Sequence, residues 1–148
     1  KNVKDIEELV KFTTLPFITK GIMIPDEAQK CADAGVAVIS VSNHGGRVLD
    51  STPGVATMLP LIREKLGGSI TITADGGVRT GYDVLKMLAL GADAVFLGRD
   101  IIRAAVGAGT LGVKLHLEHI KKTLKKAMFM TGTKTVKRVD SGILFKQK

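Results

Sequence analysis

Four short apolar segments, separated by stretches with helical patterning, constrain the fold of this chain more than any other feature. They span residues 15–19, 36–41, 69–74 and 94–97 and are rich in Ile and Val. Their hydrophobicity is nearly continuous rather than alternating, which is typical of strands in a parallel sheet. Parallel strands need crossover connections, usually helices of right-handed sense. The sequence therefore predicts an α/β fold of consecutive strand–helix units.

Helix signals occupy the segments between these strands. Pro25 begins one helix, with Asp26 and Glu27 in its first turn, and Gly35 ends it. Cys31 lies inside this helix, and we expect a small core residue there. It is the only cysteine, so an internal disulfide is impossible. Further helices are expected at residues 5–12, 55–66, 82–90 and 110–131.

Each predicted strand is followed by residues that can bind or react with a ligand. Functional residues gather in this way at the carboxyl ends of the strands of a (β/α)₈ barrel. A complete barrel needs about 250 residues and eight strands, whereas this chain has 148 residues. It is therefore either half of a barrel or a small open sheet that resembles one. The four strand ends carry Lys20-Gly21, His44-Gly45-Gly46-Arg47, Asp75-Gly76-Gly77 and Gly98-Arg99.

Three of these strand ends indicate specific chemistry. His44 offers a proton carrier and Arg47 a carboxylate clamp, although a surface loop with a structural histidine explains the same residues. Glycines in residues 75–79 and 98–99 can present backbone N–H groups to an anion, and a short helix expected at residues 100–105 would add its dipole. These two loops predict a phosphate site. The sequence has no G-x-G-x-x-G or Walker pattern, which disfavours a Rossmann or P-loop nucleotide site.

Positive charge is concentrated in residues 103–148, which hold 11 Lys and Arg against Glu118 and Asp140. Such a segment could bind nucleic acid or an anionic membrane surface. However, no aromatic residues are interleaved with the lysines for base stacking, and an apolar stripe recurs at helical spacing. We therefore interpret the lysines as a solvated helix face and expect no nucleic-acid partner. The stripe consists of Leu117, Ile120, Leu124 and Met128.

No apolar run approaches the ~20 residues of a membrane-spanning helix. The first five residues also lack an apolar signal region. We expect no integral membrane segment and a cytoplasmic location. The sequence begins at Lys1 rather than at a methionine, which favours a piece of a longer polypeptide.

Longer blocks around these strand ends resemble the FMN-dependent α-hydroxy acid oxidases and dehydrogenases, the group that includes glycolate oxidase, lactate oxidase and flavocytochrome b2. Their order and spacing follow the C-terminal half of the family's barrel, over nearly the whole chain. The resemblance implies that residues 1–148 form a single C-terminal half-barrel, strands 5–8 of a (β/α)₈ TIM barrel. The blocks are residues 15–21 (LPFITKG), 41–50 (VSNHGGRVLD), 75–86 (DGGVRTGYDVLK) and 88–99 (LALGADAVFLGR).

The resemblance implies FMN as cofactor, no metal, and oxidation of a small L-2-hydroxy acid of lactate or glycolate type to the 2-oxo acid. His44 would be the base that removes a substrate proton, and Arg47 would hold the substrate carboxylate. Lys20 would lie at the N1–C2 edge of the flavin and stabilise the charge of its reduced form. Ser42 would lie beside the ring, and Asp75 would orient groups in the same layer. Gly76 would contribute to the cofactor site, and the phosphate would be bound by Gly77, Arg79, Gly98 and Arg99.

The same resemblance implies that part of the site lies outside this sequence. In the family, the first half of the barrel supplies an active-site Tyr, a second substrate Arg and the Asp that pairs with the catalytic His. A free half-barrel would also leave two outer strands with unpaired edges. We therefore expect an N-terminal half-barrel or a second copy of this chain as partner, within a homo-oligomer. The alternative function is a half-barrel that binds FMN or another phosphate ligand without turnover and self-associates.

Overall fold

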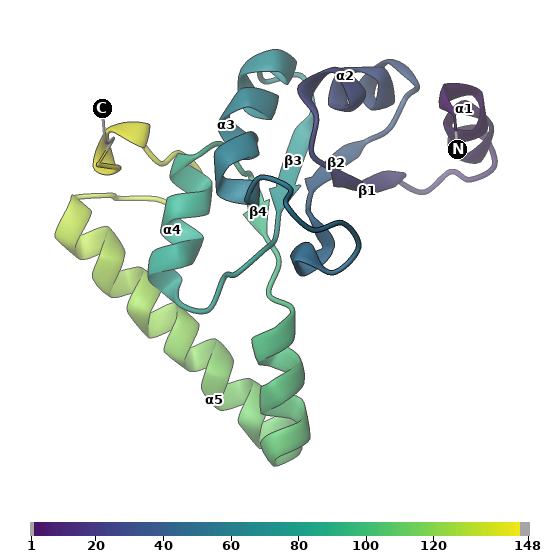
Figure 1. Ribbon diagram of the computed structural model, residues 1–148. Coiled ribbons are helices and arrows are strands. Elements are labelled where there is room, and N and C mark those ends of the chain that lie inside the picture. Colours follow the sequence, from purple (N-terminus) through teal and green to yellow (C-terminus); the bar gives the residue numbers. More distant parts are fainter. Residues whose placement is uncertain (1, 146–148) are drawn as a thin grey trace.

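The computed structural model describes residues 2–145 and contains a four-stranded parallel sheet with helices between the strands (Figure 1). The strands lie side by side in chain order, as β1-β2-β3-β4. The predicted α/β class of four parallel strand–helix units is confirmed. The strands are β1 (Ile18–Ile22), β2 (Val38–Val41), β3 (Thr71–Ala74) and β4 (Ala94–Val95). The helices are α1 (Val3–Lys11), α2 (Pro25–Asp33), α3 (Val55–Leu66), α4 (Gly81–Ala89) and α5 (Arg99–Thr131), with short 3₁₀ turns η1 (His44–Gly46) and η2 (Ser141–Ile143).

The first strand differs from its predicted position at residues 15–19. Pro16 has no backbone N–H to donate to a neighbouring strand, and β1 begins only at Ile18. It then continues through Lys20 and Gly21, where φ is +97° and the register with β2 shifts. This bulge keeps Lys20 within the strand rather than in a loop after it. The other three strands lie within their predicted ranges but are shorter.

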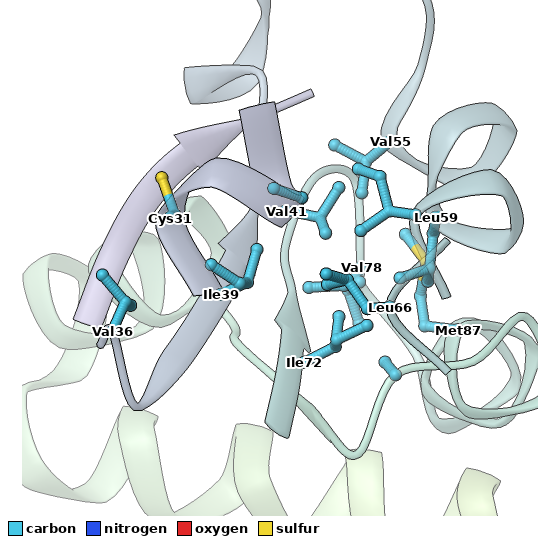
Figure 2. Close-up of a cluster of buried hydrophobic side chains, with 14 residues drawn as sticks. Cys31, Val36, Ile39, Val41, Val55, Leu59, Leu66, Ile72, Val78 and Met87 are labelled. Carbon is cyan, nitrogen blue, oxygen red and sulfur yellow. The ribbon is translucent and has the colours of Figure 1, made fainter. Parts of the chain in front are cut away.

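The hydrophobic core lies between the sheet and the helices that pack on one of its faces. Ile39 of β2, Ile72 of β3 and Leu59 of α3 are fully buried members of this cluster (Figure 2). Cys31 also belongs to this cluster, as predicted. Successive strand side chains point to opposite faces, so the intervening residues lie on the other side of the sheet. That second face carries polar side chains at one level of the sheet, with Lys20, Ser40 and Thr73 in one register row.

Helix α5 consists of two limbs. Non-helical backbone at Ala108 and Gly109 divides it into residues 99–107 and 110–131, which correspond to the two helices predicted in this region. Figure 1 shows the first limb leaving β4 and the longer second limb turning back, to pack on α4. Gly112 permits the limbs to meet closely, because a Cβ there would lie 2.2 Å from the carbonyl oxygen of Ala104.

The apolar stripe predicted for the long limb is only partly covered. Ile120 is buried, whereas Leu117 is 47% exposed. Leu124 and Met128 are half-buried. Within residues 2–145, no helix is both long and apolar enough to cross a membrane.

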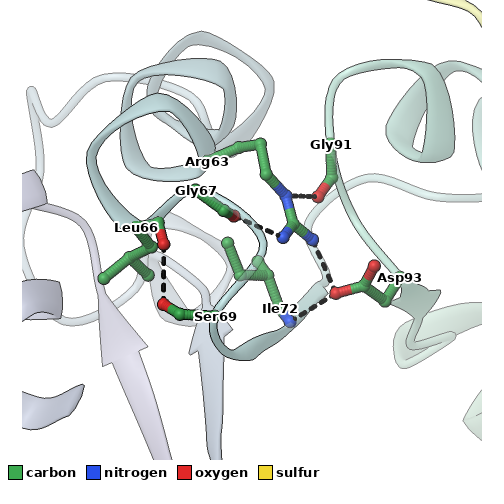
Figure 3. A network of polar contacts seen from close by, with 7 residues as sticks. All are labelled: Arg63, Leu66, Gly67, Ser69, Ile72, Gly91 and Asp93. Carbon is green, nitrogen blue, oxygen red and sulfur yellow. Dashed lines mark hydrogen bonds and ion pairs between the residues drawn. The ribbon is translucent and has the colours of Figure 1, made fainter.

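A polar network ties the amino ends of β3 and β4 to α3 (Figure 3). Arg63 donates from Nε to the carbonyl oxygen of Gly91 at 2.7 Å and from Nη1 to that of Gly67 at 3.0 Å. Its Nη2 forms an ion pair with Asp93, whose Oδ2 also accepts the backbone N–H of Ile72 at 2.8 Å. One guanidinium thus binds two segments of backbone directly, and a third, at Ile72, through the Asp93 carboxylate.

Candidate active site

Nine of the ten residues predicted for the site line one cavity of about 470 Å³ at the carboxyl ends of the strands. Parallel strands bring their carboxyl ends to the same edge, so residues far apart in the sequence meet there. Ser42 is the exception, because it is fully buried and does not line the cavity. The nine are Lys20, His44, Arg47, Asp75, Gly76, Gly77, Arg79, Gly98 and Arg99.

Ser42 connects two of the other residues. Its Oγ accepts a hydrogen bond from Lys20 Nζ at 2.9 Å and another from the backbone N–H of His44 at 3.1 Å. Lys20 Nζ also pairs with Asp75 Oδ2 at 3.0 Å. An ammonium group has three N–H donors, so one remains after these two contacts. Because the Lys20 side chain is 46% exposed, that donor can reach a ligand in the cavity.

His44 is held in an unusual backbone conformation. Its φ is +55°, in the left-handed region where histidine is more frequent than most residues but still strained by about 1 kcal/mol. Asn43 stabilises this turn, because its Oδ1 accepts the N–H of Gly45 at 3.1 Å. The imidazole lies against Gly21, where a Cβ would stand 2.5 Å from His44 Cε1. Among residues 2–145, none forms a hydrogen bond with the imidazole nitrogens, so packing rather than hydrogen bonding positions this exposed ring.

The loop after β3 presents free backbone donors to the cavity. Gly76 and Gly77 have φ of +101° and +75°, and within residues 2–145 neither N–H has an acceptor. A Cβ at Gly77 would meet open space, so a ligand can approach the backbone there. Arg79 follows in the same loop and lines the same cavity. This combination of free N–H groups and a guanidinium suits an anion.

The first turn of α5 forms another part of the cavity wall. No side chain among residues 2–145 caps this helix terminus, whose N-cap residue is Gly98, so its first N–H groups and the helix dipole also favour an anion. The Arg99 guanidinium lies against Gly45, about 3.6 Å from where a Cβ would stand. Ile102 and Arg103 line the cavity as well, although the sequence analysis did not select them. Their spacing of three and four residues from Arg99 places them on the same helix face and could have identified them.

The charges around the cavity favour an anionic ligand. Its basic side chains outnumber its acidic ones. Apolar side chains complete the wall, among them Phe96 and Leu97 of the segment after β4. The basic residues are Lys20, Arg47, Arg79, Arg99 and Arg103, and the acidic ones are Asp75 and Asp100.

The model of one protein family, described as FMN-dependent dehydrogenase, matches residues 1–146. The chain belongs to this FMN-dependent family. The resemblance predicted from the strand-end blocks is therefore confirmed, and FMN is the cofactor of the family.

Curated relatives and solved structures agree with this assignment. The L-lactate dehydrogenase of Ectopseudomonas mendocina (strain ymp) is 43% identical over 145 residues, which are 98% of this chain and 38% of that protein. The L-lactate dehydrogenase of Caulobacter sp. (strain K31) is 47% identical over 131 residues, 88% of this chain and 34% of that protein. A mandelate oxidase crystallised with benzoyl-formic acid has a TM-score of 0.89 at 39% identity, covering 92% of this chain and 41% of its own. The chain thus spans less than half the length of these relatives.

The residues of the cavity fit FMN. A phosphate monoester needs N–H donors and cations, which the loop after β3 and the start of α5 supply together. Gly77 and Gly98 both leave open the space that a Cβ would fill. The remaining N–H donor of Lys20 suits the electron-rich edge of a flavin ring.

Proposed function

We propose that this chain carries the FMN phosphate site and the proton-accepting base of an oxidoreductase that converts a small L-2-hydroxy acid, of lactate or glycolate type, to the 2-oxo acid. The observation that carries the proposal is the convergence of His44, Arg47 and Lys20 on the cavity that the glycine–arginine loops also line. The relatives support the substrate class, because they include L-lactate dehydrogenases and a mandelate oxidase crystallised with a 2-oxo acid.

The side chains of this cavity have distinct tasks in the proposed reaction. Arg47 is exposed and binds the substrate carboxylate through the two parallel N–H groups of its guanidinium. An imidazole nitrogen of His44 takes up one of the two protons that the hydroxy acid loses. When bound, FMN supplies the acceptor for the two electrons and for the second proton. Lys20 donates its remaining N–H toward the negative charge that then develops, while Ser42 and Asp75 hold its ammonium in place.

The role of His44 is tested by His44→Ala in the FMN-loaded protein. We expect FMN to remain bound and the rate of flavin reduction to fall by about 10²–10⁴-fold, the usual contribution of a positioned base. The rate is followed by anaerobic bleaching of the flavin absorbance after mixing with L-lactate, glycolate or L-mandelate. His119→Ala is the control, because His119 is exposed on α5 and does not line the cavity. Reduction of the His44→Ala flavin at the wild-type rate would exclude His44 as the base.

The proposal includes a partner for the open sides of the half-barrel. Residues 1–148 would act as the C-terminal half-barrel of the dehydrogenase domain, completed by an N-terminal half-barrel or a second copy of this chain in a homo-oligomer. The strand order supports this, because β1 and β4 are the outer strands of the sheet in residues 2–145. Edge strands with unpaired backbone groups associate readily with further strands.

A second candidate function is FMN binding without turnover. It is favoured by the His44 imidazole, which has no hydrogen-bond partner within residues 2–145. A carboxylate partner normally orients such a base and stabilises its protonated form. The flavin experiment also distinguishes the two functions, because an FMN-loaded protein that no hydroxy acid bleaches would support the binding module.

A further inference from the structure

The loop that presents Gly77 and Arg79 to the cavity is fixed by a carboxylate that does not itself line the cavity. Asp83 lies in the first turn of α4, and its Oδ2 accepts three hydrogen bonds from the end of this loop. The donors are the backbone N–H of Arg79 at 3.1 Å, the backbone N–H of Thr80 at 3.0 Å and the Thr80 hydroxyl at 2.9 Å. Thr80 and Asp83 together form a capping box.

The charge of Asp83 is well matched to these donors. Partial burial opposes the ionised carboxyl, but the hydrogen bonds from Arg79 and Thr80 outweigh that effect and lower the pKa of Asp83 below its usual value. Asp83 is therefore a fixed negative charge at neutral pH. Its loss would leave the N–H groups of Arg79 and Thr80 without their acceptor, and the loop could then adopt other conformations.

A second contact fixes the other side of the same turn. The backbone N–H of Gly81 donates to Thr123 Oγ1 of α5 at 2.8 Å. The two helices touch so closely that a Cβ at Gly81 would lie 1.9 Å from the backbone nitrogen of Leu124. The start of α4 is thus anchored on α5, and the loop ends against a rigid support.

These contacts divide the backbone donors of the turn into two groups. The N–H groups of Arg79, Thr80 and Gly81 are occupied by protein acceptors. Those of Gly76 and Gly77 have none within residues 2–145. We propose that Asp83 is a positioning residue that holds residues 76–80 in the conformation that binds the cofactor phosphate. This inference rests on the proposed function, because it assigns the phosphate of FMN to that loop.

The test compares FMN with riboflavin, which has the same ring and ribityl chain but no phosphate. Both ligands are titrated against the wild-type protein and against Asp83→Asn, Asp83→Glu and Asp5→Asn, with binding followed by flavin fluorescence. Asp83→Glu is the rescue variant, because glutamate serves equally well at this capping-box position. Asp5→Asn is the matched control, since Asp5 completes the same kind of capping box with Asn2 on α1, away from the cavity.

We expect Asp83→Asn to weaken FMN binding by about tenfold, the loss of one good charge-assisted contact, and riboflavin binding by less than about twofold. Asp83→Glu should restore the FMN affinity to within about threefold of wild type. Asp5→Asn should change neither ligand's affinity. If Asp83→Asn does not fold, Thr80→Val replaces it in the same comparison; this change removes the hydrogen bonds that the Thr80 hydroxyl forms with the Asp83 carboxylate and with the Asp83 backbone N–H.

Two results would overturn the inference while leaving the proposed function intact. In the first, Asp83→Asn binds FMN as tightly as the wild-type protein does. In the second, Asp83→Asn loses affinity for FMN and for riboflavin by the same factor, which indicates a general loss of structure. A different result would show that the proposed phosphate site itself is wrong. In that case the wild-type protein would bind FMN no more tightly than riboflavin, and the proposed role of Asp83 would also be refuted.

Discussion

Replacement of Arg63 by alanine should cost this protein about 3 kcal/mol of unfolding free energy. The change removes the hydrogen bonds to the carbonyl oxygens of Gly91 and Gly67 and the ion pair with Asp93 (Figure 3). Hydrogen bonds to charged groups contribute about 1.5–3 kcal/mol each, whereas an exposed ion pair contributes less than about 1 kcal/mol. The Arg63 side chain is 24% exposed and Asp93 is 49% exposed, so water compensates part of the loss. We therefore expect a total below the sum of the separate contacts.

The measurement is urea unfolding followed by circular dichroism. Lys65→Ala is the control, because Lys65 lies on the same helix and forms only an exposed ion pair with Asp26. Because both partners are exposed, its loss should leave the urea midpoint close to that of wild type. Arg63→Lys keeps the charge but not the planar fork that reaches three partners, and should cost about 2 kcal/mol. FMN affinity should not change in any of these variants, because the network lies at the amino ends of β3 and β4, opposite the cavity. An Arg63→Ala protein as stable as Lys65→Ala would refute this reasoning.

Two further outcomes follow from burial and close packing. Gly81→Ala places a Cβ 1.9 Å from the backbone nitrogen of Leu124. It should therefore destabilise the fold by more than about 2 kcal/mol in the same urea assay. Gly68→Ala is the control and should be nearly neutral, because a Cβ there meets open space. Cys31 should be alkylated at least about tenfold more slowly in the native protein than in urea at mildly alkaline pH, because burial raises the pKa of its thiol; equal rates would contradict its place in the core.

The edge of the sheet that carries the site could be predicted because residue type and strand topology determine it. Parallel strands place their carboxyl ends together, so His44, Asp75 and Gly98 meet whatever the detailed side-chain conformations are. Lys20 was predicted after β1 and lies inside it, yet the bulge at Gly21 leaves its side chain at the same edge. An error in strand bounds therefore did not displace the site.

Contacts that cross between elements could not be predicted in this way. The link from Ser42 to Lys20 depends on the rotamers of one side chain in β1 and one just after β2, and the approach of Arg99 to Gly45 depends on how α5 begins. The spacing of apolar residues also shows which side chains share a helix face. It does not show how far along the helix a neighbouring element covers that face. For this reason Leu117 fits the apolar stripe of α5 and is nevertheless half exposed.

Gly21 shapes the site because it has no Cβ atom. The His44 ring occupies the space that any side chain at position 21 would take, so the two positions cannot vary independently. Glycine contributes no proton, charge or nucleophile, and an inventory of functional groups would omit it. A substitution there would nevertheless move the imidazole, and its effect on the chemistry would be easily mistaken for damage to the histidine itself.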